Sequence, residues 1–347
     1  MTSVLANVTR FVTLFSEGFS LIEKVSIENY KCFRSLDVSL KPFNVLVGAN
    51  NTGKSSFLES LSAATDFGKR IARKDEYFRF DSDRPPEIRL QIDGHELGPL
   101  RHAKALGGIT RWSQDQLHLL SSILPIRYFD VPKLILRMES EGAASNTNVA
   151  EIVGNQGKEL AALMDVMLRK NRKLFYRMID LLTNLIPGLE DIDVDTPTSK
   201  FRSVNLVLDN GLEMPASLAS MGVRLMIFFA AFAFHPSPPK LILIEEPETG
   251  VHPKRLADIV KLLRGISTGE MGQSPAQIVL TTHSPYLLDC VDLETDNVLV
   301  FQREDDGSRS ATPVNKQRLQ SYMDEYMLGE FWFNGGEDVL TGAEVGK

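Results

Sequence analysis

Residues 43–60 of this 347-residue chain read FNVLVGANNTGKSSFLES, and this segment is the most informative one about the fold. Its first five residues are mostly apolar, which is typical of a strand that is buried on both faces of a sheet. Residues 48–55 fit the pattern G-x-x-x-x-G-K-[ST], and Phe57, Leu58 and Leu61 then follow at helical spacing. A strand, a glycine-rich loop and a helix in this order form a phosphate-binding loop, and we predict one here.

The predicted loop supplies the groups that a nucleoside triphosphate needs. Glycines let backbone N–H groups converge on the phosphates, and the following helix points its positive N-terminus at them. We expect Lys54 to neutralise the β- and γ-phosphates and Ser55 to bind Mg²⁺. The residues expected to contact ATP are Gly48, Asn50, Asn51, Thr52, Gly53, Lys54, Ser55 and Ser56. A glycine-rich turn without a ligand is the alternative.

Composition restricts the class of protein that carries this loop. A hydrophobic fraction of 43% and a charged fraction of 24% are typical of a globular protein. Thirty-eight basic and 45 acidic residues give a net charge of −7, which argues against coating of nucleic acid by charge alone. The longest apolar run, residues 225–234, is shorter than the roughly 20 residues that cross a bilayer, so no membrane segment is expected. Two cysteines cannot build a disulfide framework, and a cytoplasmic location is expected.

Strand-like and helix-like segments indicate an α/β fold. Strands are expected at 21–30, 35–40, 43–47, 87–93, 192–209, 240–244, 277–281 and 297–302. Residues 117–189 are expected to be mostly helical, and further helices are expected at 218–234 and 252–265. We predict a mixed central sheet flanked by helices, with a β-rich lobe and a helical insertion. The predicted divisions are a loosely ordered leader at 1–20, core at 21–115, insertion at 116–190 and core at 191–347.

A second apolar strand ends in two glutamates, Glu245 and Glu246, within the segment LILIEEPETGVHP at 241–253. Ligands of open α/β sheets bind at the carboxyl ends of the strands, so a strand beside the P-loop strand would bring both carboxylates to the phosphates. We expect Glu245 to hold Mg²⁺ through water and Glu246 to act as the general base on the attacking water. Two solvated glutamates at the end of a strand are the alternative.

A further core strand, QIVLT at 277–281, is followed by His283. A histidine at that position can hydrogen-bond the γ-phosphate or the attacking water, whereas a satisfied turn histidine is the alternative. The expected catalytic residues are therefore Lys54, Glu246 and His283.

Together these motifs resemble the ABC-type branch of P-loop ATPases, which includes RecF, SMC proteins and OLD-type enzymes. Compact stand-alone AAA family ATPases of bacteria are similar over nearly the whole chain from Leu21. The similar segments are IENYKCFRSLDVSL (27–40) for the first hairpin, GANNTGKSSFLES (48–60) for Walker A, EEPETGVHP (245–253) for Walker B and the D-loop, TTHSP (281–285) for the H-switch, and the tail at 322–336. The resemblance implies an ATPase of the ABC and RecF type.

The resemblance also implies an ABC signature motif that contacts the nucleotide of a second copy. The matching stretch is SLASMGVR at 217–224, and its expected contact residues are Ser220, Gly222 and Arg224. This stretch departs from the family pattern at Ala219 and Met221, and an ordinary helix N-terminus capped by serine is the alternative. OLD-type nucleases also carry a TOPRIM domain, and the segment after His283 is shorter than the roughly 100 residues of a typical domain, so none is expected here.

The predicted insertion contains a basic cluster with interleaved aromatic residues. Its basic residues are Arg169, Lys170, Arg172, Lys173 and Arg177, and a smaller cluster lies at 69–74. Weak contact with DNA or a partner is one interpretation, and the solvated face of an amphipathic helix is the other.

Two functions remain open at this point. The resemblance implies an ATP-hydrolysing switch that forms a homodimer or higher oligomer on ATP and acts on DNA or on a partner effector, in DNA repair or anti-phage defence. The alternative is a nucleotide-sensing scaffold with low turnover that holds and regulates a separately encoded nuclease or toxin. Both require ATP and Mg²⁺.

Overall fold

The computed structural model describes residues 19–63, 85–101, 113–141, 157–198, 200–320 and 327–341. Its contacts divide the chain into two compact units. Unit 1 comprises the described residues of segments 1–128, 240–246 and 277–347, and unit 2 comprises those of 129–239 and 247–276. Most of the expected leader, the basic cluster at 69–74 and part of the expected tail motif lie outside the described residues. The division of the core at 115 and 190 stays a prediction.

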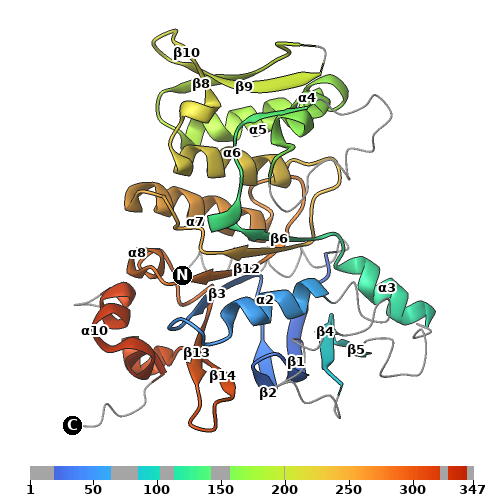
Figure 1. Ribbon diagram of the computed structural model, residues 1–347, viewed down its shortest axis with the longest axis vertical. Helices are drawn as coiled ribbons and strands as arrows, with labels where there is room; N and C mark the ends of the chain where they lie inside the picture. Colours follow the sequence, from blue (N-terminus) through green and yellow to red (C-terminus); the bar gives the residue numbers. More distant parts are fainter. Residues whose placement is uncertain are drawn as a thin grey trace, which may run out of the picture. The chain divides into compact units, whose positions relative to one another are not determined.

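A six-stranded sheet of order β14-β13-β3-β12-β11-β6 lies mostly in unit 1 (Figure 1). Its strands are β3 (Phe43–Val47), β6 (Ile126–Asp130), β11 (Leu241–Glu245), β12 (Gln277–Thr282), β13 (Asn297–Arg303) and β14 (Arg309–Pro313). Strands β11, β12, β3 and β13 are parallel to one another, and β14 is antiparallel to β13. The central sheet is therefore mixed, as predicted, and every residue of β3 and β12 is buried.

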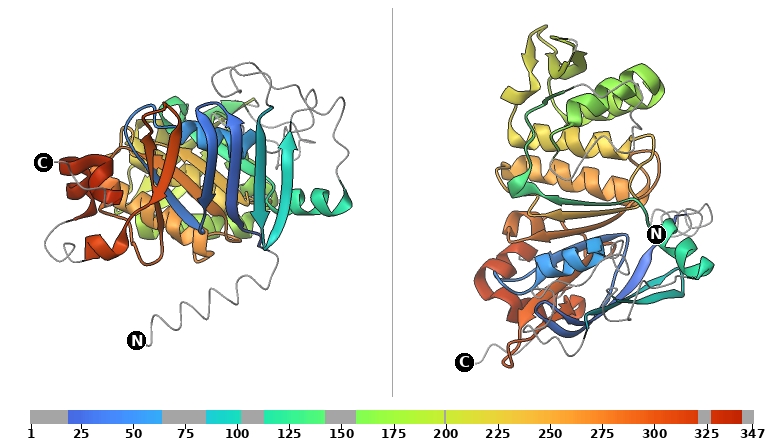
Figure 2. Two further views of the ribbon diagram at one scale, coloured as in Figure 1. Left: turned by 90° about the horizontal axis from the view of Figure 1, so that it is seen from below. Right: turned by 45° about the vertical axis from the view of Figure 1, so that its right-hand side comes forward.

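The β-rich lobe of unit 1 is a four-stranded antiparallel sheet of order β2-β1-β4-β5. Its strands are β1 (Ile22–Tyr30), β2 (Phe33–Ser39), β4 (Glu87–Ile92) and β5 (His95–Arg101), the adjacent blue and cyan strands in Figure 2. Apolar residues of this sheet pack in one core with α2 (Lys54–Ala63) and the central strands. The edge-to-face rings of Phe33, Phe57 and Phe301 belong to that core, so the P-loop helix is held between the two sheets.

Four short helices complete unit 1. They are α3 (Gln114–Ser122), α8 (Pro285–Leu288), α9 (Lys316–Gln320) and α10 (Leu328–Thr341). Helix α10 packs against α8 and β13, and the red α10 lies beside α8 in Figure 1. Helix α8 begins two residues after His283, so α10 packs against the helix that follows the expected H-switch.

Unit 2 combines four helices with a small antiparallel sheet. The helices are α4 (Leu160–Lys170), α5 (Arg172–Leu185), α6 (Met221–Ala233) and α7 (Pro253–Thr268), and the strands are β7 (Glu139–Glu141), β8 (Leu189–Asp195), β9 (Phe201–Leu208) and β10 (Glu213–Pro215). Strand β9 lies between β10 and β7 and also pairs with β8. Helix α6 is apolar on nearly all sides and its Phe228 and Phe232 contact Phe129, so it forms the centre of this unit.

Two of the expected helical segments differ in the structure. Residues 117–189 contain helices, but they also contain β6, β7 and the 3-10 turn η5 (Val131–Lys133). Strand β7 is only three residues long and pairs with β9. A segment so short carries no periodicity of its own. The helix expected at 218–234 begins at Met221, because η7 (Ala216–Leu218) precedes it and the Ser220 hydroxyl accepts a hydrogen bond from Val223 N–H. No helix among the described residues is long and apolar enough to span a membrane.

Candidate nucleotide-binding site

The glycine-rich segment forms a tight loop between β3 and α2. Gly53 has a φ of +104°, a conformation that L-residues rarely adopt. A Cβ atom at Gly53 would lie 2.9 Å from Sγ of Cys32 and 2.9 Å from Cζ of Phe33, so a side chain would collide with the β1–β2 hairpin. Both the backbone conformation and the lack of space for a side chain therefore require glycine at position 53. The β1–β2 hairpin packs against the loop at this point.

Lys54 has its ammonium group enclosed by the loop itself. Its Nζ donates hydrogen bonds to the carbonyl oxygens of Gly48 and Ala49, each at 2.8 Å, and the residue is only 5% exposed. The Thr52 hydroxyl donates to the same Ala49 carbonyl at 2.9 Å. Lys54 therefore places a buried positive charge inside the loop, while Asn50, Asn51 and Ser55 are exposed at its surface.

The acidic pair reaches this loop through the register of the parallel strands. In β11, Glu245 lies opposite Thr281 of β12, and in β12, Thr282 lies opposite Val47 of β3. The carboxyl ends of the three strands consequently lie at one edge of the sheet, where β3 runs into the P-loop. The sequence prediction of a common edge for the loop and the two glutamates agrees with this register.

The two consecutive glutamates have different partners. Oε1 of Glu245 accepts a hydrogen bond from the Tyr128 hydroxyl of the neighbouring β6. Glu246 has a φ of +47°, and its N–H donates to the carbonyl and the hydroxyl of Thr281 at 3.2 and 3.3 Å. This turn separates the two carboxylates immediately after β11 ends.

His283 lies beside the second of these carboxylates. Its Nε2 is 3.9 Å from Oε1 of Glu246. Burial and the positive charge of Lys54 lower the pKa of His283, and the carboxylates of Glu246 and Glu337 oppose this shift. The lowered pKa favours the neutral imidazole, in which one ring nitrogen can accept a hydrogen bond while the other donates one.

Three residues of this site were not predicted from the sequence. Tyr128 contacts Glu245 as described, and Nε of Arg309 on β14 donates to the Asn51 carbonyl at 2.7 Å. Glu337 on α10 accepts a hydrogen bond from the Ala49 N–H at 2.6 Å. The one signal in the sequence was the pair of glycines just before Glu337, which marks a break in α10.

The expected signature residues belong to unit 2, whereas the P-loop, both glutamates and His283 belong to unit 1. Ser220 caps α6, and Gly222 is buried with its Cα so close to Arg255 that an added Cβ would lie 3.1 Å from the Arg255 Cβ. Nη1 of Arg224 donates to the Leu136 carbonyl at 2.9 Å, while its buried Nε has no hydrogen-bond partner among the described residues.

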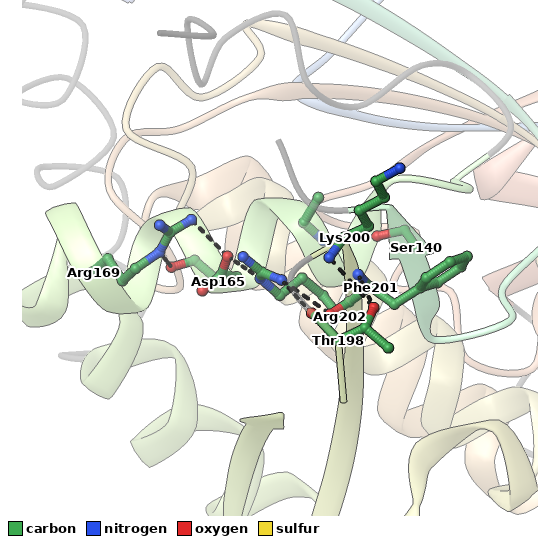
Figure 3. A network of polar contacts seen from close by, with 8 residues as sticks. Ser140, Asp165, Arg169, Thr198, Lys200, Phe201 and Arg202 are labelled. Carbon is green, nitrogen blue, oxygen red and sulfur yellow. Dashed lines mark hydrogen bonds and ion pairs between the residues drawn. The ribbon is translucent and has the colours of Figure 1, made fainter. Parts of the chain in front are cut away.

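The expected basic cluster spans two helices of unit 2, because α4 ends at Lys170 and α5 begins at Arg172. One member of the cluster, Arg169, pairs with a buried carboxylate. Oδ2 of the buried Asp165 accepts from Nη2 of Arg169 at 2.6 Å and from Nε of Arg202 at 2.5 Å (Figure 3). The charge of Arg169 is therefore partly compensated, and the expected DNA contact stays a prediction.

Two family models match the chain. Residues 108–289, more than half of the chain, match the family described as "AAA domain, putative AbiEii toxin, Type IV TA system", and residues 21–97 match the "AAA ATPase domain" family. The chain is also similar to an OLD nuclease of Thermus scotoductus, at 22% identity over 374 residues. This alignment covers 92% of the present chain and 70% of the relative.

Solved SMC head domains share the fold. The Smc head of Pyrococcus furiosus, bound to the C-terminal domain of ScpA, matches with a TM-score of 0.55 and 14% identity, covering 88% of this chain and 99% of that one. The Smc head of Pyrococcus yayanosii matches with a TM-score of 0.52 and 12% identity, with the same coverage of both chains. The SMC heads share the fold and the OLD nuclease is similar in sequence, while the family model that matches residues 108–289 shows that the chain belongs to the AAA-domain family described above.

Proposed function

We propose that the protein binds ATP with Mg²⁺ at the P-loop and hydrolyses it with Glu246 as general base. The observation that supports this most directly is the 3.9 Å separation between Glu246 and His283 at the sheet edge where β3 enters the loop. A carboxylate next to a neutral histidine can take a proton from water while the imidazole orients that water. Lys54 supplies the positive charge for the phosphates.

The residues present fit a nucleoside triphosphate. The loop is shaped by glycine where a Cβ would collide, and its lysine is enclosed by backbone carbonyls. Anions are stabilised by such a loop because its N–H groups and the N-terminus of α2 carry positive partial charge. The contacts proposed for ATP run from Gly48 to Ser56, and Asn50, Asn51, Thr52 and Gly53 are among them.

Oxygen ligands for Mg²⁺ are available beside the loop. Ser55 is exposed at the start of α2, and the Glu245 carboxylate closes β11. Hydroxyl and carboxylate oxygens are the ligand class that Mg²⁺ prefers, often with water between. Bound Mg²⁺ would neutralise phosphate charge, and Ser55 and Glu245 are the residues proposed to hold it.

We further propose that ATP brings two or more copies together, with Ser220, Gly222 and Arg224 of one copy contacting the nucleotide of another. The resemblance of the stretch at 217–224 to the signature motif of the family supports this assembly. The switch would act on DNA or on a separately encoded effector in DNA repair or anti-phage defence. The names of the matched family and of the OLD nuclease, which refer to a toxin and a nuclease, favour this setting. A low-turnover sensing scaffold for a separate nuclease or toxin is the second candidate, favoured by the departures of the signature stretch at Ala219 and Met221.

Paired variants of the two glutamates test the proposal. Glu246→Gln is expected to leave ATP binding intact and to lower turnover by roughly 10²–10⁴-fold, the usual contribution of a general base. Glu245→Gln is expected to weaken Mg²⁺-dependent binding as well as turnover. Glu294→Gln removes the same charge from an exposed site of unit 1 and serves as the matched control.

Calorimetry with ATP and a phosphate-release assay measure the two quantities, and light scattering of Glu246→Gln with ATP and Mg²⁺ measures assembly. Wild-type turnover in the Glu246→Gln variant would refute the general base. ATP binding without turnover in the wild type, with or without DNA, would favour the scaffold. A monomer at every concentration would refute the assembly.

A further inference from the structure

The carboxylate of Glu337 contacts the P-loop although Glu337 and Ala49 are 288 positions apart in sequence. The Ala49 N–H donates to Oε1 of Glu337 at 2.6 Å, and the Ala49 carbonyl receives the Lys54 ammonium. The electrostatic influence of Glu337 also reaches His283. The Glu337 carboxylate therefore lies against the P-loop and near His283, one of the expected catalytic residues.

Two glycines in α10 form a bend immediately before Glu337, and this bend places its carboxylate at the P-loop. Gly336 has φ +60° and ψ −147°, a conformation available essentially to glycine alone, and Glu337 follows it directly. At Gly335, an added Cβ would lie 2.0 Å from Cγ2 of Val339. The helix thus breaks immediately before the residue that reaches the loop.

The rest of α10 is anchored within unit 1. Near its start, Gly329 N–H donates to Oδ1 of Asp289 at 2.8 Å, and a Cβ at Gly329 would lie 2.2 Å from the Pro285 carbonyl oxygen. Near its end, the Leu340 carbonyl accepts from Asn315 N–H at 3.0 Å. With both ends held, the position of Glu337 depends on the backbone at Gly336.

We propose that Glu337 is a built-in anion of the nucleotide site, which occupies a P-loop N–H and competes with the phosphates of ATP. The inference rests on the proposed function, because it needs the loop to bind a triphosphate. A carboxylate and a phosphate are both oxyanions, and two like charges a few ångströms apart repel each other at a half-exposed site. ATP binding would therefore be weakened by Glu337 and would release it from Ala49. Nucleotide would in this way change the position of α10, whose Phe333 is 79% exposed.

A supporting role for Glu337 makes the opposite prediction. If the carboxylate only held the loop in shape, its loss would weaken ATP binding. If it competes with phosphate, its loss tightens ATP binding. The sign of the change in affinity therefore decides between the two roles.

Calorimetric titration of the full chain with ATP and Mg²⁺ measures that sign. Glu337→Gln keeps the side-chain length and a hydrogen-bond acceptor but removes the charge, and we expect ATP to bind about ten-fold more tightly. Asp338→Asn is the matched control, because it removes the same charge from the adjacent, exposed position. Its affinity is expected to stay within about two-fold of the wild type. Raising the ionic strength should reduce the gain of Glu337→Gln, since salt screens the repulsion.

A backbone variant tests the same contact without changing any charge. Nothing lies within 4 Å of a Cβ at Gly336, so Gly336→Ala acts through backbone conformation and not through a collision. We expect it to withdraw Glu337 from the loop and to tighten ATP binding as Glu337→Gln does. Combining the two substitutions should then give no further gain. A thermal melt of each variant verifies that it is folded.

The outcomes separate this inference from the proposed function. Unchanged or weaker ATP binding in Glu337→Gln, with a wild type that binds ATP through Lys54, would overturn the inference alone. ATP binding that Lys54→Ala leaves unchanged would overturn the proposed site, and the inference with it. ATP binding by Glu337→Gln but not by the wild type would support the inference strongly, whereas no binding by either would overturn both.

Discussion

Nε2 of His283 lies 3.9 Å from Oε1 of Glu246, although the two residues follow different strands and are 37 positions apart in sequence. The parallel register of β11 and β12 produces this proximity, because it sets Glu245 opposite Thr281. The positive charge of Lys54 is close enough to this pair to lower the pKa of His283. The pKa of His283 therefore reports on the charges of Lys54 and Glu246.

We expect the His283 ring to titrate below the ordinary histidine pKa, because burial and Lys54 disfavour the imidazolium. Lys54→Ala removes a cause of the lowering and should raise the pKa of His283. Glu246→Gln removes an opposing cause and should lower the pKa further. NMR titration of the ring protons measures the pKa of His283 in the wild type and in both variants. A shift in the reverse direction in either variant would contradict the geometry.

The same shift makes stability depend on pH. Because the folded-state pKa of His283 is lower than the unfolded-state value, the unfolded chain binds the proton more readily. The stability associated with the neutral ring is present above the ordinary histidine pKa and is lost as pH falls through the folded-state value. Between pH 7 and pH 5, the melting temperature of the wild type should therefore fall more than that of His283→Gln. Equal falls would show that the ring makes no such contribution.

Lys54→Ala should abolish ATP binding, because Lys54 is the positive charge enclosed by the loop carbonyls. Lys261→Ala removes an equal charge from an exposed position of α7 and should bind ATP like the wild type. Calorimetry compares the two variants. Equal affinity in Lys54→Ala would place the nucleotide elsewhere.

Tyr128→Phe should raise the Mg²⁺ concentration needed for ATP binding by about ten-fold, the lower range for loss of a group that orients a metal ligand. The reason is that the Tyr128 hydroxyl donates to Oε1 of Glu245. Tyr286→Phe, at a tyrosine that is 59% exposed, is the matched control. Titration of Mg²⁺ at fixed ATP measures the midpoint. An unchanged midpoint would mean that Tyr128 does not orient Glu245 for the metal.

Arg202→Ala should destabilise unit 2 by about 1–3 kcal/mol, because it removes the less exposed of the two arginines that pair with the buried Asp165 while Arg169 remains. Arg169→Ala should cost less than about 1 kcal/mol, since the Arg169 side chain is 50% exposed and water can replace it. Urea unfolding of both variants gives the difference. Similar losses would show that exposure does not distinguish the two arginines.

DNA binding, if measured by fluorescence anisotropy, should be weak and should fall steeply with salt, because few basic residues are available. Neutralising Arg169, Lys170, Arg172 and Lys173 together should remove it. Charge reversal is avoided in this design because Arg169 also contacts Asp165. Tight binding that survives the four substitutions would show that the cluster is not the contact.

The P-loop, the two glutamates and the histidine could be found in the sequence because each belongs to a short contiguous pattern. Glycine at 53 and lysine at 54 are local requirements, and the apolar residues of 43–47 predict a buried strand without knowledge of its neighbours. Composition and residue spacing were likewise sufficient for the α/β class. These features depend on backbone conformation and burial within a few residues.

The contacts between the loop and residues distant in sequence are visible only in the folded structure. Tyr128 reaches Glu245 through the order of strands in the sheet, Arg309 reaches Asn51 from β14, and Glu337 reaches Ala49 from a bent helix. No local pattern encodes these contacts, because each depends on strand order or helix packing summed over the whole core. The sequence by itself therefore predicts a phosphate-binding loop, and packing sets which charged and polar side chains surround that loop.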